Sequence, residues 1–452
     1  MHILKGYTKQ EISWMMYDWA NSAHSVIIVT LLPIFFDTVA GYTADSVSSM
    51  STWGYATSIA MLIVALAAPF LGVFGDIRGM RKKLFSFFML LGVAACAGMA
   101  FTPGMDFTSG PVAAGKVASL ILVLYIVSVI GFDASAIYYD AFLTDVTIEE
   151  RMDKVSTMGY GLGYIGGSTI PLLIFLIMNL VGVPMLTCLA VVFGLTAVWW
   201  LAFSLPLLKN CEQTSGKPYE KGDVARSIKG VGTTIKEIIA NKPMLIYILS
   251  YFFYIDGVHT VISMATTYGT NLGLDSTGMM LALLLVQILG LPFCLLYIKC
   301  SEKFGARTMV GFGICVYMFI CIFAFFMNSL WQFWVLAVLC ATSQGGIQAL
   351  SRSMYGKLIP DKDRSGEFFG FFDIFGKFSS IMGPALVGVV SSVVANGMLG
   401  AQGLTAQTAT AEQVDAINAQ SSHYGILSII IIIIVGAVLY FGFLPKAEHA
   451  KQ

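Results

Sequence analysis

Twelve long apolar stretches restrict this chain more than any other feature of its sequence. A helix needs roughly 20 apolar residues to cross a bilayer core of about 30 Å, and the chain is 57% hydrophobic and only 12% charged. Lipid offers no partner to backbone N–H and C=O groups, so runs of this length without period-2 alternation predict helices rather than barrel strands. The predicted spans are 12–36, 52–74, 84–103, 117–143, 156–180, 184–208, 243–268, 277–299, 308–327, 330–355, 367–395 and 422–445. The chain is therefore predicted to be an all-α membrane protein.

Charged residues between these spans predict its orientation. Lys and Arg gather in every second loop and at both ends of the chain, and only Lys116, Arg352 and Lys377 fall elsewhere. The positive-inside rule places such loops in the cytoplasm. The first span is too long for a cleavable signal peptide and carries two ionisable residues. We expect a multi-pass protein of the cytoplasmic membrane, inner or plasma, with both termini in the cytoplasm.

Several functional classes are disfavoured by composition and motif context. The 26 basic and 26 acidic side chains cancel, so no charge excess points to nucleic acid. The eight cysteines form no C-x-x-C pair, which predicts neither a disulfide framework nor a zinc site. The G-x-G-x-x-G of residues 161–166 lies inside a predicted span without a preceding strand, and Gly110–Lys116 is followed by Val117 instead of the Ser or Thr of a phosphate loop. We predict no cofactor, no metal site and no enzymatic activity.

A polar linker separates two similar halves. Residues 209–242 contain several glycines and many basic residues, and they divide the chain into 1–208 and 243–452, each with six predicted spans. Two pseudo-symmetric six-helix bundles are typical of transporters that rock around a central site. Glycines in the fifth and eleventh spans, including Gly163, Gly166, Gly167, Gly376 and Gly383, predict close helix packing.

Four strings carry a family resemblance. The segment Gly72-x-x-x-Asp76-x-x-Gly79-x-Arg81-Lys82 resembles the signature loop of the major facilitator superfamily, with Ile77 at its usual basic position and Arg78 one place on. The strings YDWANSA from Tyr17, GGIQALSRS from Gly345 and EFFGFF from Glu367 are similar to the vacuole-effluxer-like branch, which is related to the autophagy-linked vacuolar amino-acid exporter. The resemblance implies the major facilitator fold, secondary transport and a cavity lined by the first, fourth, seventh and tenth spans. It makes amino acids a plausible substrate class.

Ionisable residues inside the spans are the candidate binding site. A charge at the bilayer centre costs at least about 2.5–3.5 kcal/mol, so each needs a partner, a hydrated cavity or a neutral state. A rise of about 1.5 Å per residue puts His24, Asp133 and Asp256 at similar depth. We expect Asp133 or Asp256 to carry a coupling proton, with a structural hydrogen bond as the alternative. The candidate substrate and proton-coupling residues are Asp18, Asn21, His24, Asp133, Tyr138, Asp140, Asp256, His259, Gln348 and Lys377.

The remaining charges predict a conformational latch. Arg352, near the inner end of the tenth span, is expected opposite Asp363 and Glu367, and Asp373 pairs with Lys377 at i, i+4 spacing. The family resemblance implies a clamp made by Asp76 with the following arginines. Breaking such a latch would shift the equilibrium between inward-open and outward-open states. The predicted latch residues are Asp76, Arg78, Arg81, Arg352, Glu367 and Asp373.

Together these features predict a secondary active transporter of a small polar solute, coupled to protons or another ion and working as a monomer in lipid by alternating access. Amino acids or related zwitterions are favoured because the lining acids outnumber the bases and the family resemblance agrees. A cation-coupled sugar or glycoside symporter is one alternative. A membrane receptor that keeps the fold without transporting is another.

Overall fold

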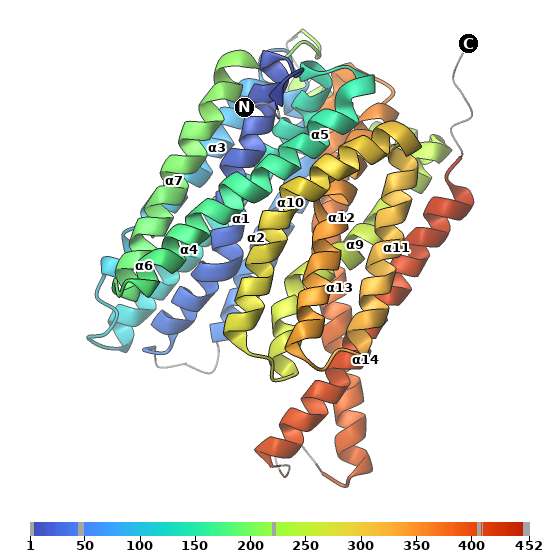
Figure 1. Ribbon diagram of the computed structural model, residues 1–452. Helices are drawn as coiled ribbons and strands as arrows, with labels where there is room; N and C mark the ends of the chain where they lie inside the picture. Colours follow the sequence, from blue (N-terminus) through green and yellow to red (C-terminus); the bar gives the residue numbers. More distant parts are fainter. Residues whose placement is uncertain (1–3, 44–48, 219–222, 405–407, 409, 446–452) are drawn as a thin grey trace. The chain divides into compact units, whose positions relative to one another are not determined.

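The computed structural model describes residues 4–43, 49–218, 223–404, 408 and 410–445 (Figure 1). Within the described residues, twelve helical spans are long and apolar enough to cross a membrane. The prediction of an all-α protein with twelve membrane-spanning helices is confirmed. The helices divide into two compact units, which are described separately below.

Unit 1 comprises Met1–Gly232 and Gly356–Ile374. In it α3 packs along α4, and α1 packs along α5 and α7 (Figure 1). A π-helical turn, Tyr164–Thr169, joins α5 to α6 so that the two make one span. The helices of the first stretch are α1 (Lys9–Ala40), α2 (Ser49–Gly75), α3 (Arg81–Met99), α4 (Pro111–Val146), α5 (Glu149–Gly163), α6 (Ile170–Leu180) and α7 (Met185–Asn210).

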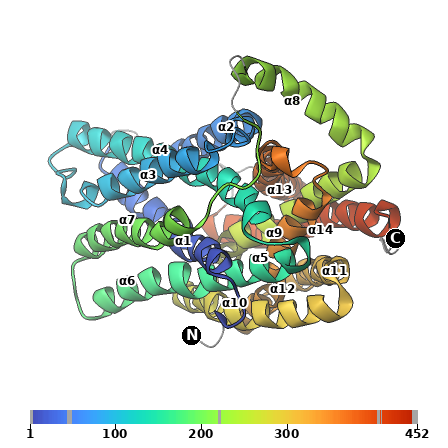
Figure 2. The same cartoon turned by 90° about the horizontal axis from the view of Figure 1, so that it is seen from above.

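Unit 2 comprises Thr233–Tyr355 and Phe375–Gln452. In it α14 packs along α9 and α11. The helix α8 (Asp223–Ala240) leads from unit 1 into unit 2 and lies within the predicted linker (Figure 2). The division into 1–208, 209–242 and 243–452 stays a prediction. The remaining helices are α9 (Lys242–Asn271), α10 (Ser276–Phe304), α11 (Ala306–Phe325), α12 (Leu330–Leu358), α13 (Ser365–Ala401) and α14 (Ala411–Val438).

A capping box begins α1 and ties it to α5. The Thr8 hydroxyl accepts the N–H of Glu11 at 3.1 Å, and the Glu11 carboxylate accepts the N–H of Thr8 at 2.8 Å. This arrangement satisfies two helix-end donors that lack intrahelical partners. The same carboxylate is buried and pairs with Arg151 of α5 at 2.7 Å. The first residues of the chain's first span are thereby fixed within unit 1.

Two glycines let α1 approach the π-helical turn of the fifth span. A Cβ at Gly166 would lie 2.1 Å from the Trp19 ring, and one at Gly167 would lie 2.6 Å from the Trp19 carbonyl oxygen. Real Cβ contacts are longer, so a side chain at either position would push α1 away. The prediction that the glycines of the fifth span serve close helix packing is confirmed.

Candidate functional site

A buried carboxylate, Asp256, is the centre of a polar cluster in unit 2. It lies in the middle of α9 with no solvent exposure. Its Oδ1 accepts the backbone N–H of Gly383 on α13 at 2.9 Å and the hydroxyl of Thr260 at 3.4 Å. Its Oδ2 is buried and has no hydrogen-bond partner among the described residues. Asp256 therefore holds α13 with one oxygen and keeps the other available.

Helix α13 meets Asp256 where its sequence weakens the helix. Pro384 lies inside α13, and a proline in a helix removes a donor and displaces the preceding turn. Gly383 precedes it, and a Cβ there would lie 2.6 Å from Oδ1 of Asp256 and 1.8 Å from the Thr260 hydroxyl oxygen. The backbone N–H of Gly383 thus points at Asp256, and the missing side chain of this glycine leaves room for the carboxylate.

His259 extends the cluster one helical turn along α9. Its Nδ1 lies 3.4 Å from the hydroxyl oxygen of Ser379 on α13. Gln348 of α12 and Lys377 of α13 are its other polar neighbours. The Gln348 amide in turn donates to the carbonyl of Gln344 at 3.1 Å. An acid, a base, an imidazole and an amide from three helices are gathered in one part of unit 2.

The structure thus brings together four predicted site residues, namely Asp256, His259, Gln348 and Lys377. It also adds Thr260 and Ser379, which were not predicted, and Gly383, which was predicted only as a close-packing glycine. The Gly-Pro pair in the eleventh span was the signal that could have identified Gly383, because such a pair frees backbone groups inside a helix.

His24 occupies the position in unit 1 that corresponds to His259, but its surroundings differ. Its ring lies 4.9 Å from that of Phe132 and 5.0 Å from that of Trp200, centroid to centroid. Both ring nitrogens are buried without a hydrogen-bond partner among the described residues. His24 also lines a void of about 10 Å³ with Cys96 and Met99. His24 and His259 therefore share a sequence motif, but aromatic rings surround His24 where polar side chains lie near His259.

Other predicted residues on α1 lie at helix contacts. Asp18 is buried against α5, where a Cβ at Gly159 would come within 2.4 Å of its Oδ2. Asn21 is buried one turn further along α1. Next to them the hydroxyl oxygens of Tyr17 and Ser135 are 2.7 Å apart. These contacts join α1 to α4 and α5, and a substrate role for Asp18 and Asn21 stays a prediction.

The three predicted residues of α4 have different surroundings within unit 1. Asp133 is buried within electrostatic reach of the Tyr125 hydroxyl. Tyr138 donates its hydroxyl to the carbonyl of Leu71 on α2 at 2.9 Å, which is a helix-packing contact. Asp140 is half-buried. Of the two predicted acids of α4, Asp133 is thus the more deeply buried.

A second polar site in unit 1 is built around Asp76, in the turn between α2 and α3. Its Oδ1 accepts the backbone N–H of Gly366 at 2.7 Å, and its Oδ2 accepts that of Glu367 at 2.8 Å. These are free donors of the first turn of α13, where the helix dipole favours a negative charge. Asp76 therefore acts as a cap supplied from another part of the chain.

The fully buried Arg81 completes this site, which we call the clasp: Asp76, Arg81, Asp145 and residues 365–367. One Arg81 nitrogen pairs with Asp76 at 2.9 Å and donates to the Ser365 hydroxyl, also at 2.9 Å. The other pairs with Asp145 at the end of α4. The buried guanidinium thus lies between two acids, and removing the ionised partner of such a buried charge typically costs about 3–5 kcal/mol.

The segment that follows α7 is also part of the surroundings of the clasp. The Gln213 side-chain oxygen accepts the N–H of Gly79 at 2.9 Å, and its amide donates to the carbonyl of Gly75 at 2.9 Å. Asp145 accepts both the N–H and the hydroxyl of Ser215, at 2.9 and 2.7 Å. Sequence reasoning missed these residues because a short polar segment without periodicity predicts only a linker.

The predicted latch residues are distributed unevenly. Arg78 is exposed, and its backbone N–H donates to the carbonyl of Lys217 at 2.9 Å. Its side chain pairs with no acid among the described residues, so the predicted part of Arg78 in the latch stays a prediction. Glu367 contributes its N–H and accepts from Arg364 at 3.1 Å. Arg352 is buried in unit 2, and Asp373 is half-buried in α13. Roles for the last two in a latch stay predictions.

Burial raises the pKa of Asp76 to about 7, although Arg81 and the two backbone donors favour its charged form. The unperturbed value for Asp is about 3.9. Desolvation therefore outweighs the neighbouring positive charge at this position. A carboxyl with such a pKa changes charge near neutral pH.

Comparison with known proteins places these sites in context. Residues 7–397 match the family described as "Vacuole effluxer Atg22 like". The chain is 40% identical to the "Uncharacterized MFS-type transporter YxiO" of Bacillus subtilis over 452 residues, which cover 98% of this chain and 96% of that protein. It is 25% identical to "Autophagy-related protein 22-1" of Penicillium rubens over 274 residues, 55% of this chain and 46% of the fungal protein.

Solved structures share the fold at low sequence identity. The proton:xylose symporter XylE of the major facilitator superfamily superposes with a TM-score of 0.69 at 14% identity, covering 97% of this chain and 95% of that one. A bacterial homologue of the iron transporter ferroportin in its outward-facing state gives 0.62 at 15% identity, over 95% and 98% of the two chains. These likenesses show the major facilitator fold.

Proposed function

Because this chain belongs to the Atg22-like vacuole effluxer family and is therefore a multi-pass membrane transporter rather than an enzyme, we propose that it moves a small zwitterion, with amino acids favoured, by proton-coupled alternating access. The observation that carries this proposal is the polar cluster around Asp256. A zwitterion needs a positive charge near its carboxylate and neutral oxygen acceptors near its amino group. In the cluster Lys377 can supply the first, and the side-chain oxygens of Gln348 and Ser379 can supply the second, which leaves Asp256 for the coupling proton.

Proton coupling is supported by the two unequal oxygens of Asp256. The contacts with Gly383 and Thr260 both end on Oδ1. Oδ2 can therefore take or release a proton without breaking them. A buried carboxylate that changes charge alters the energy of its surroundings strongly, because charge is expensive inside a membrane protein. This is the property required of a coupling residue.

The clasp supports alternating access. It holds the first turn of α13 to the turn between α2 and α3 within unit 1. The same helix continues into unit 2 and carries Gly383. We propose that the clasp opens when the transporter changes between its two states. Contacts that exist in only one of two states stabilise that state, so forming or breaking them shifts the equilibrium between the two.

The distribution of Lys and Arg further supports a location in the cytoplasmic membrane with both termini and the clasp on the cytoplasmic side. Attaching a protease-cleavable tag to the C-terminus tests this orientation. Cleavage in intact cells would contradict it, whereas cleavage confined to inverted membrane vesicles would support it.

Counterflow in proteoliposomes tests the substrate class. Vesicles loaded with one unlabelled solute at high concentration should accumulate the same labelled solute when the carrier accepts it. We expect accumulation with one or more amino acids and none with pentoses or hexoses. Accumulation of a sugar but of no amino acid would overturn the zwitterion proposal, and no accumulation of any solute would overturn transport of these two classes altogether.

A further inference from the structure

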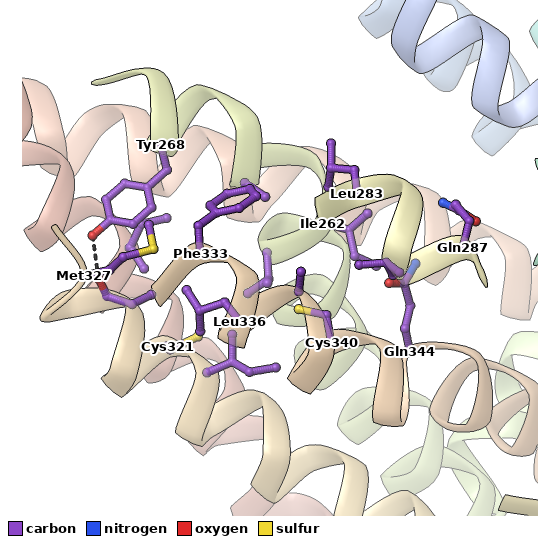
Figure 3. Close-up of a pocket in the computed structure, with 17 residues that line it drawn as sticks. Ile262, Tyr268, Leu283, Gln287, Cys321, Met327, Phe333, Leu336, Cys340 and Gln344 are labelled. Atoms are coloured by element: carbon purple, nitrogen blue, oxygen red, sulfur yellow. Dashed lines mark hydrogen bonds between the residues drawn. The ribbon is translucent and has the colours of Figure 1, made fainter. Parts of the chain in front are cut away.

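Helix α8, in the linker, carries apolar side chains that the rest of the chain leaves uncovered. Apolar side chains of unit 2 can be buried within the unit, as Phe333, Leu336 and Met327 are around a cavity of about 100 Å³ (Figure 3). On α8, by contrast, Ile235 is 43% and Ile239 56% exposed. The helix is not one of the twelve candidate spans, so these two isoleucines are not the lipid-facing side of a membrane-spanning helix.

The exposed isoleucines belong to a continuous apolar face of α8. Val231, Ile235, Ile238 and Ile239 follow the spacing i, i+4, i+7 and i+8, which places them on one side of a helix. Ile238 is buried, so Ile235 and Ile239 form a strip beside the part of α8 that the chain covers. Lys236 is exposed on the other side of this strip. Around α8 the surface therefore passes from a covered side through an apolar strip to a charged side.

The connection to α9 holds this strip near the end of a span. The Asn241 side chain accepts the N–H of Met244 at 3.3 Å and begins α9 as a new helix. If α8 continued straight into α9, the ring of Pro243 would clash with the carbonyl of Ile239 one turn earlier. Ile239 precedes Lys242, the first residue of the span, by three positions, so their Cα atoms are at most about 11 Å apart. The strip is thus confined to the neighbourhood of the membrane surface.

The other end of the linker is held at the same face of the membrane. Lys217 donates its N–H to the carbonyl of Asp76 at 3.0 Å, and its carbonyl accepts the N–H of Arg78 at 2.9 Å. These bonds join the linker to the turn between α2 and α3. Four candidate spans separate this turn from the start of α9. An even number of crossings returns the chain to the face from which it started, so both ends of the linker lie at one membrane surface.

The charges of the linker fit an anionic surface. Residues 217–242 contain six Lys or Arg and three Asp or Glu, a difference of +3. Lys236 and Lys242 are exposed at the end of α8 that is nearest to the span. Anionic phospholipids of the cytoplasmic leaflet attract basic segments that lie close to the membrane. A helix with an apolar strip beside basic residues lies in the headgroup region, with its apolar side toward the acyl chains.

From these observations we propose that α8 is a membrane-surface helix whose partner is anionic phospholipid. Ile235 and Ile239 enter the boundary between headgroups and acyl chains, and Lys236 and Lys242 contact the lipid phosphate groups. With the orientation proposed above, this is the cytoplasmic leaflet. The contact does not depend on which substrate the transporter carries.

Amide hydrogen exchange in the full chain tests the contact. Nanodiscs made of phosphatidylcholine with an equal amount of phosphatidylglycerol are compared with nanodiscs of phosphatidylcholine alone. The amides of residues 233–240 should exchange at least fivefold more slowly with the anionic lipid. High salt should remove most of this difference, because salt screens exposed charges. Equal exchange in the two lipids would overturn the proposal.

A double isoleucine variant tests the apolar strip. Ile235→Gln with Ile239→Gln should raise the exchange rate of the same amides at least fivefold in the anionic nanodiscs. Gln is at least as good a helix former as Ile, so the increase reports lost lipid contact rather than lost helix propensity. Ile148→Gln is the matched control, because Ile148 is 60% exposed but lies outside α8. Wild-type exchange in the double variant would contradict insertion of the strip.

A double lysine variant tests the charge. Lys236→Gln with Lys242→Gln should remove the difference between the two lipids, whereas Lys116→Gln, at an exposed position near the start of α4, should keep it. The comparison of lipids with the wild-type chain needs no variant, so it remains decisive where a variant does not fold. If α8 exchanges fast in both lipids and slows only after a cytosolic protein fraction is added, the strip binds a protein and the lipid proposal is overturned.

Discussion

At the scale of single residues, Asp256 and Gly383 determine each other's surroundings. The acid accepts the glycine N–H, and the absence of a glycine side chain leaves the space that the acid and Thr260 occupy. Gly388 lies five residues further along the same helix and has no neighbouring atom near the position of an added Cβ. Substituting each glycine in turn therefore distinguishes a packing requirement at Gly383 from a general preference for glycine in α13.

Gly383→Ala should lower the free energy of unfolding by about 1–3 kcal/mol through overpacking and should impair transport. Gly388→Ala should be neutral or slightly stabilising, because Ala is the better helix former by about 1 kcal/mol. Thermal unfolding in nanodiscs measures both effects. An equal Tm for the two variants would show that the contact with Thr260 is not close in the folded protein.

Asp76 predicts a pH dependence of the clasp. Its pKa of about 7 in the clasp lies above the value of about 3.9 expected when the carboxyl is exposed. A raised pKa means that the closed clasp holds a proton which the open form releases, so its contribution to stability is complete below about pH 4 and is lost as the pH rises through 7. Acid conditions should therefore favour the closed clasp.

Asp76→Asn removes this titration and keeps the size of the side chain. The difference in Tm between wild type and Asp76→Asn should change between pH 5 and pH 8, in favour of wild type at the lower value. Asp106→Asn is the matched control, because Asp106 is an exposed acid whose pKa is lowered by its hydrogen bonds to Ser109 and Thr108, so that it stays charged throughout. Parallel Tm curves for wild type and Asp76→Asn would contradict the raised pKa.

At the scale of elements, α2 and the start of α13 approach through backbone atoms within unit 1. A Cβ at Gly72 would lie 2.2 Å from the carbonyl oxygen of Gly366, and one at Gly370 would lie 2.5 Å from that of Ala68. Backbone cannot move aside as the end of a flexible side chain can. The spacing of these glycines therefore sets how closely α13 lies to Asp76.

Gly72→Ala should separate the two helices and weaken the hydrogen bonds from Gly366 and Glu367 to Asp76. Amide hydrogen exchange at these two residues should become faster by at least tenfold, while the exchange of the α9 amides, which belong to unit 2, stays unchanged. Gly98→Ala in α3 is a milder control, because only the flexible side chain of Leu124 lies near its added Cβ, at 3.0 Å. Unchanged exchange at 366 and 367 would mean that the glycine contact does not hold the clasp together.

Elements differed in how well the sequence predicted them. Length and hydropathy were sufficient for the twelve spans, because the bilayer sets the length of an apolar helix. The clasp was recognised in part, through Asp76 and Arg81. Its partners Asp145, Gln213 and Ser215 come from segments far apart in the chain, and the sequence did not point to them because the burial of Arg81, which requires a second acid, is known only from the structure.

The histidines show where a repeat in the sequence misleads. His24 and His259 follow the same local pattern, but Phe132 and Trp200 on other helices surround His24, while Ser379, Gln348 and Lys377 lie near His259. A short sequence motif that recurs in both halves describes one face of one helix and gives no information about the helices that pack against it. The chemistry of a site depends on those neighbours.

At the scale of the whole molecule, the chain is a major facilitator transporter whose second unit contains the polar cluster around Asp256. We assign the coupling proton to Asp256, because one of its oxygens has no hydrogen-bond partner among the described residues while the other holds α13. Substrate exchange and proton movement are then separable, since exchange requires the cluster to bind the substrate but not to change charge.

The most direct test is to measure proton entry into proteoliposomes with an internal pH-sensitive dye, after adding an amino acid that counterflow has identified as a substrate. Wild type and Asp106→Asn should acidify the interior, whereas Asp256→Asn should retain counterflow and lose the acidification. If Asp256→Asn acidifies the interior at the wild-type rate, Asp256 does not carry the coupling proton and the account is contradicted.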